Sequence, residues 1–502
     1  MKRSKKIFKV VRYIFLSILV FLSLLMFLSS NWISKHFSFS NFEEVIFTIT
    51  SPVLNAGQGL VFSFIDENVV PSLIVVLILI VYLVIKKNND IIIKFKIFNK
   101  FVEVNLCSKV ITCVSIILII GFTIFSFIRL GNRVYFFNYV YNNLHSSTFI
   151  EENYVNPKDV KLVFPETKKN LIYIFLESME STYINNLDND YIPELSKIAS
   201  KNLNFSNSNG IGGAHQVYGV GWTIAGMVAQ TSGVPLKTPF NGNLLGNYYD
   251  NIVGGALSIG EILKSNGYNN YLMVGSDASF GSRDLYFKNH GDYEIFDYYT
   301  AIDEGLIDED YFVFWGFEDD KLFSYAKNKL KEISKSDKPF NFTMLTVDTH
   351  ANDGFMDESC EHKYDNEYLN SVSCSSVKVN KFINWLKKQD FYDDTVVIIS
   401  GDHLSMNNYS FSNFNGEYDR TVYNAFLNVS LSNEFTLNRE FYTMDMFPTT
   451  LAALNVEIKG NRLGLGTNLF SGEKTLLEKY GFNYVNIELS KNSKFYNEYI
   501  MR

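Results

Sequence analysis

Three long hydrophobic stretches without a charged residue occupy the first part of the chain. They cover residues 13–33, 69–85 and 110–128. Each is close to the ~20 residues that an α-helix needs to cross the hydrocarbon core of a bilayer. The pattern therefore predicts a membrane region over residues 1–130, with about three spanning helices. We interpret the first stretch as an uncleaved anchor rather than a signal peptide, because no small-residue cleavage site follows Ser30.

A fourth uncharged stretch, residues 45–65, is interpreted differently. Polar, glycine and proline residues in its middle would leave the backbone of a helix poorly satisfied in lipid. These residues are Pro52, Asn55, Gly57, Gln58 and Gly59. We therefore predict an interfacial or re-entrant segment, which leaves the number of crossings odd.

Basic residues indicate which side of the membrane each segment faces. One cluster lies at the N-terminus and another follows the second hydrophobic stretch, and short basic segments favour the cytoplasmic side. The clusters are Lys2, Arg3, Lys5 and Lys6, and then Lys86, Lys87, Lys94, Lys96 and Lys100. An odd number of crossings then places the C-terminal part of the chain outside the cytoplasm.

Residues 131–168 are polar and mixed, and we interpret them as a linker. From residue 169 to residue 502, short apolar runs alternate with helical patterns. This alternation is typical of an α/β fold with a largely parallel sheet.

Three of the apolar runs end in polar residues. NLIYIFLE ends in Glu177, NFTMLTVDTH in His350, and TVVIISGDH in Asp402 and His403. Because ligands of open α/β sheets bind at the carboxyl ends of the strands, we expect one polar centre built from these segments. Its carboxylate and imidazole groups suit manganese, magnesium or zinc. The alternative is that the carboxylates merely cap the helices that follow.

Thr223 is a candidate nucleophile. It follows a glycine-rich turn in GVGWTIAGMVA, where a helix is expected to begin. The amides at a helix N-terminus favour an anionic phosphate, and a bound metal would lower the pKa of the hydroxyl. The alternative is a simple N-cap threonine.

The net charge of −8 comes without a basic stripe interleaved with aromatic residues, so nucleic acid is not an expected partner. Cys107 and Cys113 lie in or beside the third hydrophobic stretch, whereas Cys360 and Cys374 flank a polar loop. The second pair either forms a disulfide, which would fit an oxidising compartment, or remains as two separate thiols.

Taken together, the motifs resemble those of the membrane phosphoglycerol transferases, which belong to the alkaline phosphatase and sulfatase superfamily. The motifs are LESMES at Glu177, GWTIAGMVA at Thr223, TVDTHANDGF at His350, GDH at Asp402, DMFPTTLAAL and NRLGLGTNLFS. The likeness covers roughly residues 170–471 and is greater to the transferase that decorates osmoregulated periplasmic glucans than to lipoteichoic acid synthase. It implies an αβα sandwich.

The resemblance also implies roles for single residues. Glu177, Asp402 and His403 correspond to the metal ligands of the family, and the resemblance implies that the metal is manganese. Thr223 corresponds to a residue that is both a metal ligand and the covalent nucleophile. His350 corresponds to a residue that contacts the phosphoglycerol group.

Arg283, in SFGSRDLYF, corresponds to an arginine that binds phosphate in the lipoteichoic acid synthases. A surface ion pair with Asp277 or Asp284 is the alternative for Arg283. His215 in GGAHQVYG either lines the same cleft or has no role.

The sequence departs from the lipoteichoic acid synthases at two points. The aromatic residue that precedes their arginine is replaced around Gly281, and three hydrophobic stretches stand where they have five spans. The C-x-P-x-R segment of sulfatases is absent, which argues against hydrolysis of sulfate esters.

The expected function is a two-step transfer of phosphoglycerol from phosphatidylglycerol to a cell-envelope glycan or polymer. The enzyme would be a multi-pass protein of the bacterial inner membrane with its catalytic domain outside the cytoplasm. Phosphoethanolamine transfer, phosphodiester hydrolysis and a non-catalytic membrane scaffold are the alternatives.

Overall fold

The computed structural model describes residues 2–39, 41–50, 58–85, 91–97, 100–106, 108–184, 189–237, 246, 250–351, 353–407 and 419–502. The chain forms two compact units. One combines Met1–His36 with Gly57–Asn138, and the other combines Phe37–Ala56 with Tyr139–Arg502.

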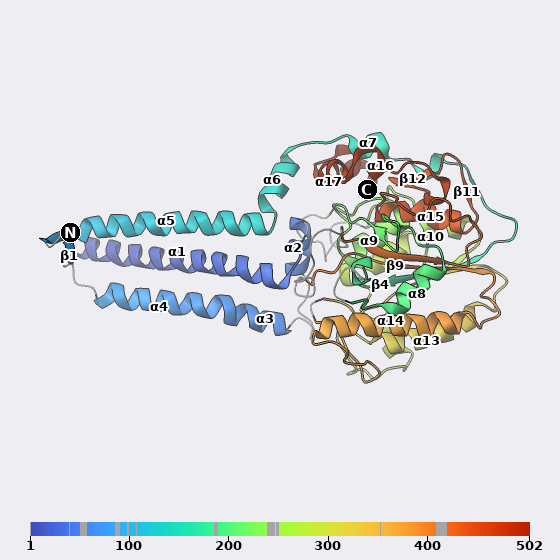
Figure 1. Cartoon of the computed structure of the whole chain (residues 1–502), viewed down its shortest axis with the longest axis horizontal. Helices are drawn as coiled ribbons and strands as arrows, with labels where there is room; N and C mark the ends of the chain where they lie inside the picture. The colour runs from blue at the N-terminus through green and yellow to red at the C-terminus, as the bar shows by residue number, and fades with distance from the viewer. Residues whose placement is uncertain are drawn as a thin grey trace. The chain divides into compact units, whose positions relative to one another are not determined.

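The first unit consists mainly of long apolar helices that lie alongside one another (Figure 1). Its helices are α1 (Lys2–His36), α3 (Gln58–Phe64), α4 (Val70–Ile85) and α5 (Ser108–Arg133), and its strands β1 (Ile91–Ile97) and β2 (Lys100–Leu106) pair antiparallel. Segments long and apolar enough to cross a membrane are Val10–His36, Gly59–Tyr82 and Val110–Arg133. The described residues thus contain three candidate spans by length and composition, and the second begins ten residues before the predicted 69–85.

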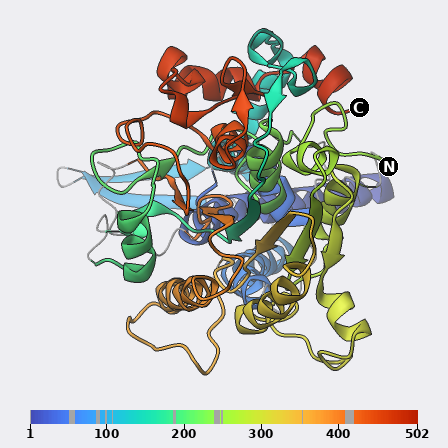
Figure 2. The same ribbon diagram turned by 90° about the vertical axis from the view of Figure 1, so that its right-hand side faces the viewer.

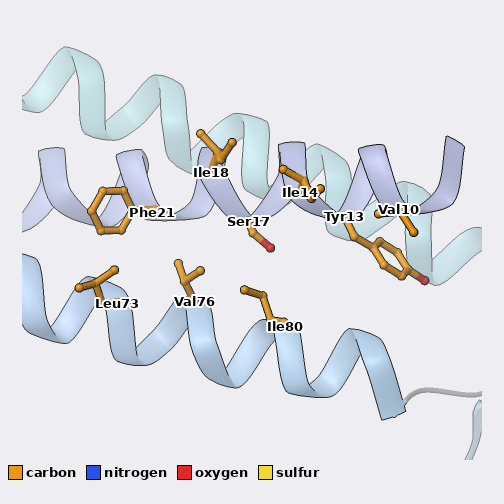
Figure 3. Close-up of a pocket in the computed structure, with 9 residues that line it drawn as sticks. All are labelled: Val10, Tyr13, Ile14, Ser17, Ile18, Phe21, Leu73, Val76 and Ile80. Atoms are coloured by element: carbon orange, nitrogen blue, oxygen red, sulfur yellow. The ribbon is translucent and has the colours of Figure 1, made fainter. Parts of the chain in front are cut away.

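An apolar groove of about 480 Å³ runs between α1 and α4 (Figure 3). Its walls include Tyr13, Ser17 and Phe21 of α1 and Val76 of α4. The hydroxyls of Tyr13 and Ser17 are the polar side-chain groups in its lining. Among the described residues, its lining contains no charged group of the kind that chemistry on a phosphate ester requires.

The second unit is built around a seven-stranded sheet with the order β5-β10-β9-β4-β8-β6-β7. The five strands from β9 to β7 run parallel, whereas β10 is antiparallel to both β9 and β5. The bounds are β4 (Asn170–Leu176), β5 (Gly213–Ala214), β6 (Asn269–Val274), β7 (Glu294–Phe296), β8 (Phe340–Leu345), β9 (Thr395–Gly401) and β10 (Val422–Leu427).

Helices cover both faces of this sheet (Figure 2). In β4, Tyr173 and Phe175 point into one hydrophobic core, and Ile172 and Ile174 point into the other. The strand is buried on both faces, which is why its sequence is continuously apolar. One core contains α9 (Thr223–Ser232), α10 (Ile259–Ser265) and α15 (Met446–Ala453), and the other contains α8 (Pro193–Lys201), α13 (Asp319–Ile333) and α14 (Glu367–Leu386). The predicted αβα sandwich is confirmed.

The remaining elements surround these layers. They are α2 (Phe42–Thr50), α6 (Phe136–Leu144), α7 (Phe149–Asn153), α11 (Arg283–Asn289), α12 (Tyr298–Asp303), α16 (Leu476–Tyr480) and α17 (Phe482–Ser490), with β3 (Leu162–Val163) paired to β11 (Glu457–Ile458) and β12 (Arg462–Leu463) to β13 (Gly466–Thr467). The segment interpreted as a linker, residues 131–168, thus contains helices and contributes β3 to a small sheet.

The stretch predicted to be interfacial, residues 45–65, is divided between the units. Its first part lies in α2 of the second unit, and its last part lies in α3 at the start of a candidate span. Residues 51–57 fall outside the described residues, as do Cys107, Lys86 and Lys87.

Cys360 and Cys374 form a disulfide with a Cα–Cα distance of 5.4 Å. The bond ties the loop before α14 to the helix itself. Of the two alternatives for this pair, the structure has the bridge. Cys113 is an exposed free thiol.

Candidate functional site

The parallel register of β4 and β9 brings two acidic side chains together. Leu176 pairs with Gly401, and each strand is followed at once by a carboxylate, Glu177 and Asp402. His403 comes next. Donor atoms of Glu177, Asp402 and His403 all lie within 4.8 Å of one another, and all three residues are buried. Neighbouring parallel strands thus deliver the three groups to one point of the sheet edge.

Backbone and hydroxyl donors fix the orientation of these groups. The amides of Ser178 and His403 both donate to Asp402 Oδ1 at 2.8 Å. Ser178 Oγ donates to Glu177 Oε1 at 2.7 Å. His403 Nδ1 lies 2.8 Å from the carbonyl oxygen of Leu404 and donates to it, which leaves Nε2 with its lone pair in the neutral ring. That atom lies 3.4 Å from Glu177 Oε1 and 3.5 Å from Asp402 Oδ2.

Two atoms of this centre are buried without a hydrogen-bond partner in the described part of the chain. They are Asp402 Oδ2 and His403 Nε2. Buried polar atoms are normally paired, so both call for a ligand. Two carboxylates and an imidazole without a thiolate form a donor set for Mn²⁺, Mg²⁺ or Zn²⁺. The residues therefore fit a divalent cation.

The electrostatics of the centre agree with that fit. Burial raises the pKa of Asp402 well above its usual value, and the nearby Glu177 carboxylate raises it further. Burial lowers the pKa of His403, but the charges of Asp402 and Glu177 outweigh burial and raise it to about 10. For Glu177, burial raises the pKa, but the charges of His403 and His350 outweigh it, and the pKa falls below its usual range. The centre attracts positive charge.

Thr223 is the first residue of α9, and its Oγ1 donates to Glu177 Oε2 at 3.3 Å. The N-cap position belongs to Trp222, so the N-cap alternative for Thr223 does not hold. Gly226 lets α9 approach the segment that carries Asp402 and His403, because a Cβ at this position would lie 2.1 Å from the Asp402 carbonyl oxygen. Gln230 also donates to the Gly401 carbonyl at 2.9 Å. The hydroxyl is thereby held beside the carboxylates.

His350 lies in the loop that follows β8. Its Nδ1 is 2.8 Å from the Ala351 carbonyl oxygen, and its ring centroid is 4.6 Å from that of Trp315. A buried network supports the loop: Asp319 accepts the Val347 amide at 2.8 Å, and Lys378 Nζ donates to Asp348 at 2.8 Å. The charge of His350 contributes to the lowered pKa of Glu177, so His350 lies near the centre formed by Glu177, Asp402 and His403.

Arg283 begins α11 and is buried, with 4% of its surface exposed. Its Nη2 donates to Ser276 Oγ at 3.0 Å and to the Asp277 carbonyl at 2.6 Å, and its Nε donates to the Phe280 carbonyl at 3.0 Å. Among the described residues it forms no ion pair with a carboxylate, so the surface-pair alternative does not describe it. Burial lowers its pKa to about 10, and the charges of Asp277 and Glu177 partly oppose that effect.

His215 is not part of this centre. Its Nε2 lies 2.7 Å from Glu440 Oε2, and its ring packs 5.6 Å from Phe482. The pairing with Glu440 indicates a structural role for His215.

Sequence reasoning missed a continuous series of aromatic rings beside the centre, which we call the aromatic arc. Successive centroids are 5.6 Å apart between Trp222 and Phe47, 6.0 Å between Phe47 and Phe280, 5.4 Å between Phe280 and Trp315, and 4.6 Å between Trp315 and His350. Trp222 directly precedes Thr223, which was a signal in the sequence. Phe47 and Trp315 come from distant segments and carry no local pattern that points to the site.

Comparisons with known proteins identify the family and the fold. The Sulfatase family profile matches residues 169–456. Proteins named phosphoglycerol transferase I from Escherichia coli and from Shigella boydii serotype 18 are 36% identical to the chain over 326 residues, which are 63% of this chain and 41% of theirs. The chain therefore spans less than half the length of these relatives. The crystal structure of the lipoteichoic acid synthase LtaP from Listeria monocytogenes has the same fold, with a TM-score of 0.50, 20% identity and coverage of 65% of this chain and 82% of that one. The chain belongs to the Sulfatase family.

Proposed function

We propose that the protein transfers phosphoglycerol from phosphatidylglycerol to a glycan or polymer of the cell envelope through a covalent intermediate on Thr223. The observation that carries the proposal is the placement of Thr223 Oγ1 at 3.3 Å from Glu177, within a buried centre that has two unpartnered ligand atoms. The names of the relatives support the choice of phosphoglycerol.

The chemistry has two balanced steps. In the first, Thr223 Oγ attacks the phosphorus of the headgroup, a new P–Oγ bond forms, and the P–O bond to diacylglycerol breaks. The departing diacylglycerol takes up a proton, and Thr223 gives one up. In the second, an acceptor hydroxyl attacks the phosphorus, loses its proton, and releases the threonine hydroxyl with a proton restored.

Glu177, Asp402, His403 and the Thr223 hydroxyl would hold the metal ion, for which manganese is our first choice and magnesium or zinc the alternatives. When bound, such an ion supplies Lewis-acid stabilisation of charge on phosphate oxygens and lowers the pKa of a hydroxyl. The metal-ligating residues are otherwise positioned by the hydrogen bonds described above.

Other groups of the chain would bind the phosphate and move protons. An anion on Thr223 would lie at the first turn of α9, where the free backbone amides and the helix dipole favour negative charge. His350 Nδ1 is engaged by the Ala351 carbonyl, so Nε2 is the nitrogen that can exchange a proton with the leaving or entering oxygen. The bonds of Arg283 use Nε and Nη2 and hold its guanidinium plane, so Nη1 is the nitrogen through which we propose that it binds an anionic ligand.

We place the catalytic unit outside the cytoplasm of a bacterial cell, on an inner membrane crossed by the apolar helices. The disulfide between Cys360 and Cys374 supports this placement, because such bonds persist in oxidising compartments. The basic clusters that flank the candidate spans support it independently.

The test uses the full chain in detergent with headgroup-labelled phosphatidylglycerol and Mn²⁺, without an acceptor. We expect label on Thr223, with a Thr223→Ser variant retaining part of it and a Thr223→Ala variant losing it. Label from phosphatidylethanolamine alone would assign phosphoethanolamine transfer instead. Release of free glycerol phosphate without covalent labelling would indicate hydrolysis, and equal labelling of wild type and Thr223→Ala would reject the nucleophile.

A further inference from the structure

The segment that joins the first two candidate spans is part of the catalytic unit. Residues 37–50 contact the loop that follows His403: the Ser38 amide donates to the Met406 carbonyl at 2.9 Å, and Phe37 forms a bridge with Asn407. Arg420 Nη1 donates to Ser38 Oγ at 3.3 Å. The segment thus packs on the catalytic unit close to His403, one of the proposed metal ligands.

Helix α2, in this segment, packs against the turn that precedes the nucleophile. A Cβ at Gly221 would lie 2.0 Å from Glu44 Oε1 and 2.8 Å from Gln216 Nε2, so Gly221 permits this close approach. The other end of the Gln216 amide, Oε1, accepts the Leu404 backbone N–H at 2.7 Å. Through Gly221 and Gln216, α2 is connected to the segments that carry Thr223 and His403.

Glu43 holds the beginning of α2 in place. It is 6% exposed, and the Tyr218 hydroxyl and the Lys237 ammonium lie near enough to influence its pKa. Burial raises the pKa of Glu43 to about 7. Phe42 packs beside it, 5.0 Å from the Tyr139 ring. The helix is anchored by specific polar contacts, as well as by apolar packing.

Phe47 is the residue of α2 that reaches the aromatic arc. Its side chain is 6% exposed and lies between the rings of Trp222 and Phe280. Trp222 precedes Thr223, and Phe280 lies beside Gly281, whose added Cβ would be 3.4 Å from Ile224. Phe47 therefore bridges the aromatic residues on either side of the start of α9.

We propose that α2 forms the donor-side wall of the active site and that Phe47 is a specificity-determining residue for a phospholipid donor. This inference rests on the proposed function. The phosphate of such a donor must reach Thr223 while the diacylglycerol that departs remains in apolar surroundings. The aromatic arc is the cluster of apolar rings beside the nucleophile, with Trp222 and Phe47 buried and Phe280 and Trp315 half-buried. The residues on both sides of α2 lead into apolar helices, since α1 ends at His36 and α3 begins at Gln58. The helix that forms this wall therefore lies in the segment of the chain between two candidate spans.

The test compares two donors on the full chain in detergent. One is phosphatidylglycerol in mixed micelles, and the other is the water-soluble diester glycerol p-nitrophenyl phosphate, which carries the same transferred group without acyl chains. For Phe47→Ala we expect kcat/KM to fall about tenfold with the lipid and less than about twofold with the soluble diester. A tenfold fall is the size expected when part of the apolar contact between the Phe47 ring and the lipid is lost. Phe47→Leu should give an intermediate ratio. The control is Ile49→Ala on the same helix, because Ile49 is 72% exposed.

Each result decides the inference. An equal fall with both donors, or no fall with the lipid, would show that α2 only braces the fold and would overturn the proposal. If Phe47→Ala does not fold, as judged from thermal unfolding, the lipid-to-soluble ratio of Phe47→Leu decides in the same way. Failure of wild type to transfer phosphoglycerol from either donor would instead reject the proposed function.

Discussion

Removal of the divalent ion and its return provide the sharpest test of the metal-ligating residues. A ligand that binds only the folded state at 100 times its Kd stabilises that state by about 2.7 kcal/mol. With roughly 2 °C per kcal/mol for a large domain, Mn²⁺ should raise the Tm of the EDTA-treated protein by about 5 °C. Differential scanning fluorimetry at fixed pH measures this shift. The buried, unpartnered Asp402 Oδ2 and His403 Nε2 are its physical source.

The Asp402→Asn variant makes the prediction specific. Its amide oxygen can still accept the Ser178 and His403 amides, so the hydrogen bonds that orient this segment are retained. We therefore expect the metal-free Tm to stay within about 2 °C of wild type while the Mn²⁺ shift is lost.

A second pair of variants controls for the histidine. His403→Gln should also lose the shift, whereas His215→Gln should keep it, because His215 pairs with Glu440 outside the centre. A full Mn²⁺ shift in Asp402→Asn or His403→Gln would refute the assignment of these ligands.

Three further outcomes follow from the same contacts. Arg283→Lys keeps a charge but loses the three hydrogen bonds of the guanidinium, so we expect kcat/KM for the lipid donor to fall about tenfold or more in a headgroup-transfer assay, and full activity would contradict a phosphate-binding role. Lys378→Met leaves the buried Asp348 unpaired, and it should lower the free energy of unfolding by about 3–5 kcal/mol in denaturant titrations, whereas a change below about 1 kcal/mol would show that the network is dispensable. The folded-state pKa of His403 is raised from 6.5 to about 10, so its contribution to the stability of the metal-free protein is complete below pH 6.5 and is lost as pH rises toward 10. Tm measured against pH in EDTA should fall over that range for wild type, and a slope equally steep in His403→Gln would rule out this residue as the cause.

The strand-end residues could be predicted from sequence because their placement follows from local pattern and sheet geometry. A continuously apolar run is typical of a buried parallel strand, and the residue after such a run lies at the carboxyl edge. Glu177 and Asp402 needed nothing more than that rule, whereas His350 lies five residues beyond the end of β8 and Thr223 needed the glycine-rich turn before its helix. These candidate residues could be identified without knowing the order of the strands, which makes β4 and β9 neighbours.

Other parts of the site depend on contacts that no local pattern encodes. Nothing around Trp315 predicts that its ring packs against His350. Nothing in GGAHQVYG shows that His215 pairs with Glu440 rather than with the residues at the strand ends. The burial of Arg283 was equally hidden, since an Arg-Asp dipeptide in a polar loop is typical of exposed surface. Tertiary packing decides each of these cases.

The stretch over residues 45–65 shows why hydropathy could not resolve the second span. Apolar residues in an uncharged stretch are expected both in lipid and in a protein interior, because each environment removes them from water. In α2, Val45 and Phe47 are buried against the catalytic unit, whereas α3 continues into a candidate span. The acidic residues Glu43 and Glu44 at the start of α2 distinguish the two environments, since carboxylates next to Tyr218 and Gln216 find polar partners that a bilayer core does not offer. A short acidic start before an apolar run, between two spans, is therefore the feature that favours a helix docked on the catalytic unit over one lying in lipid.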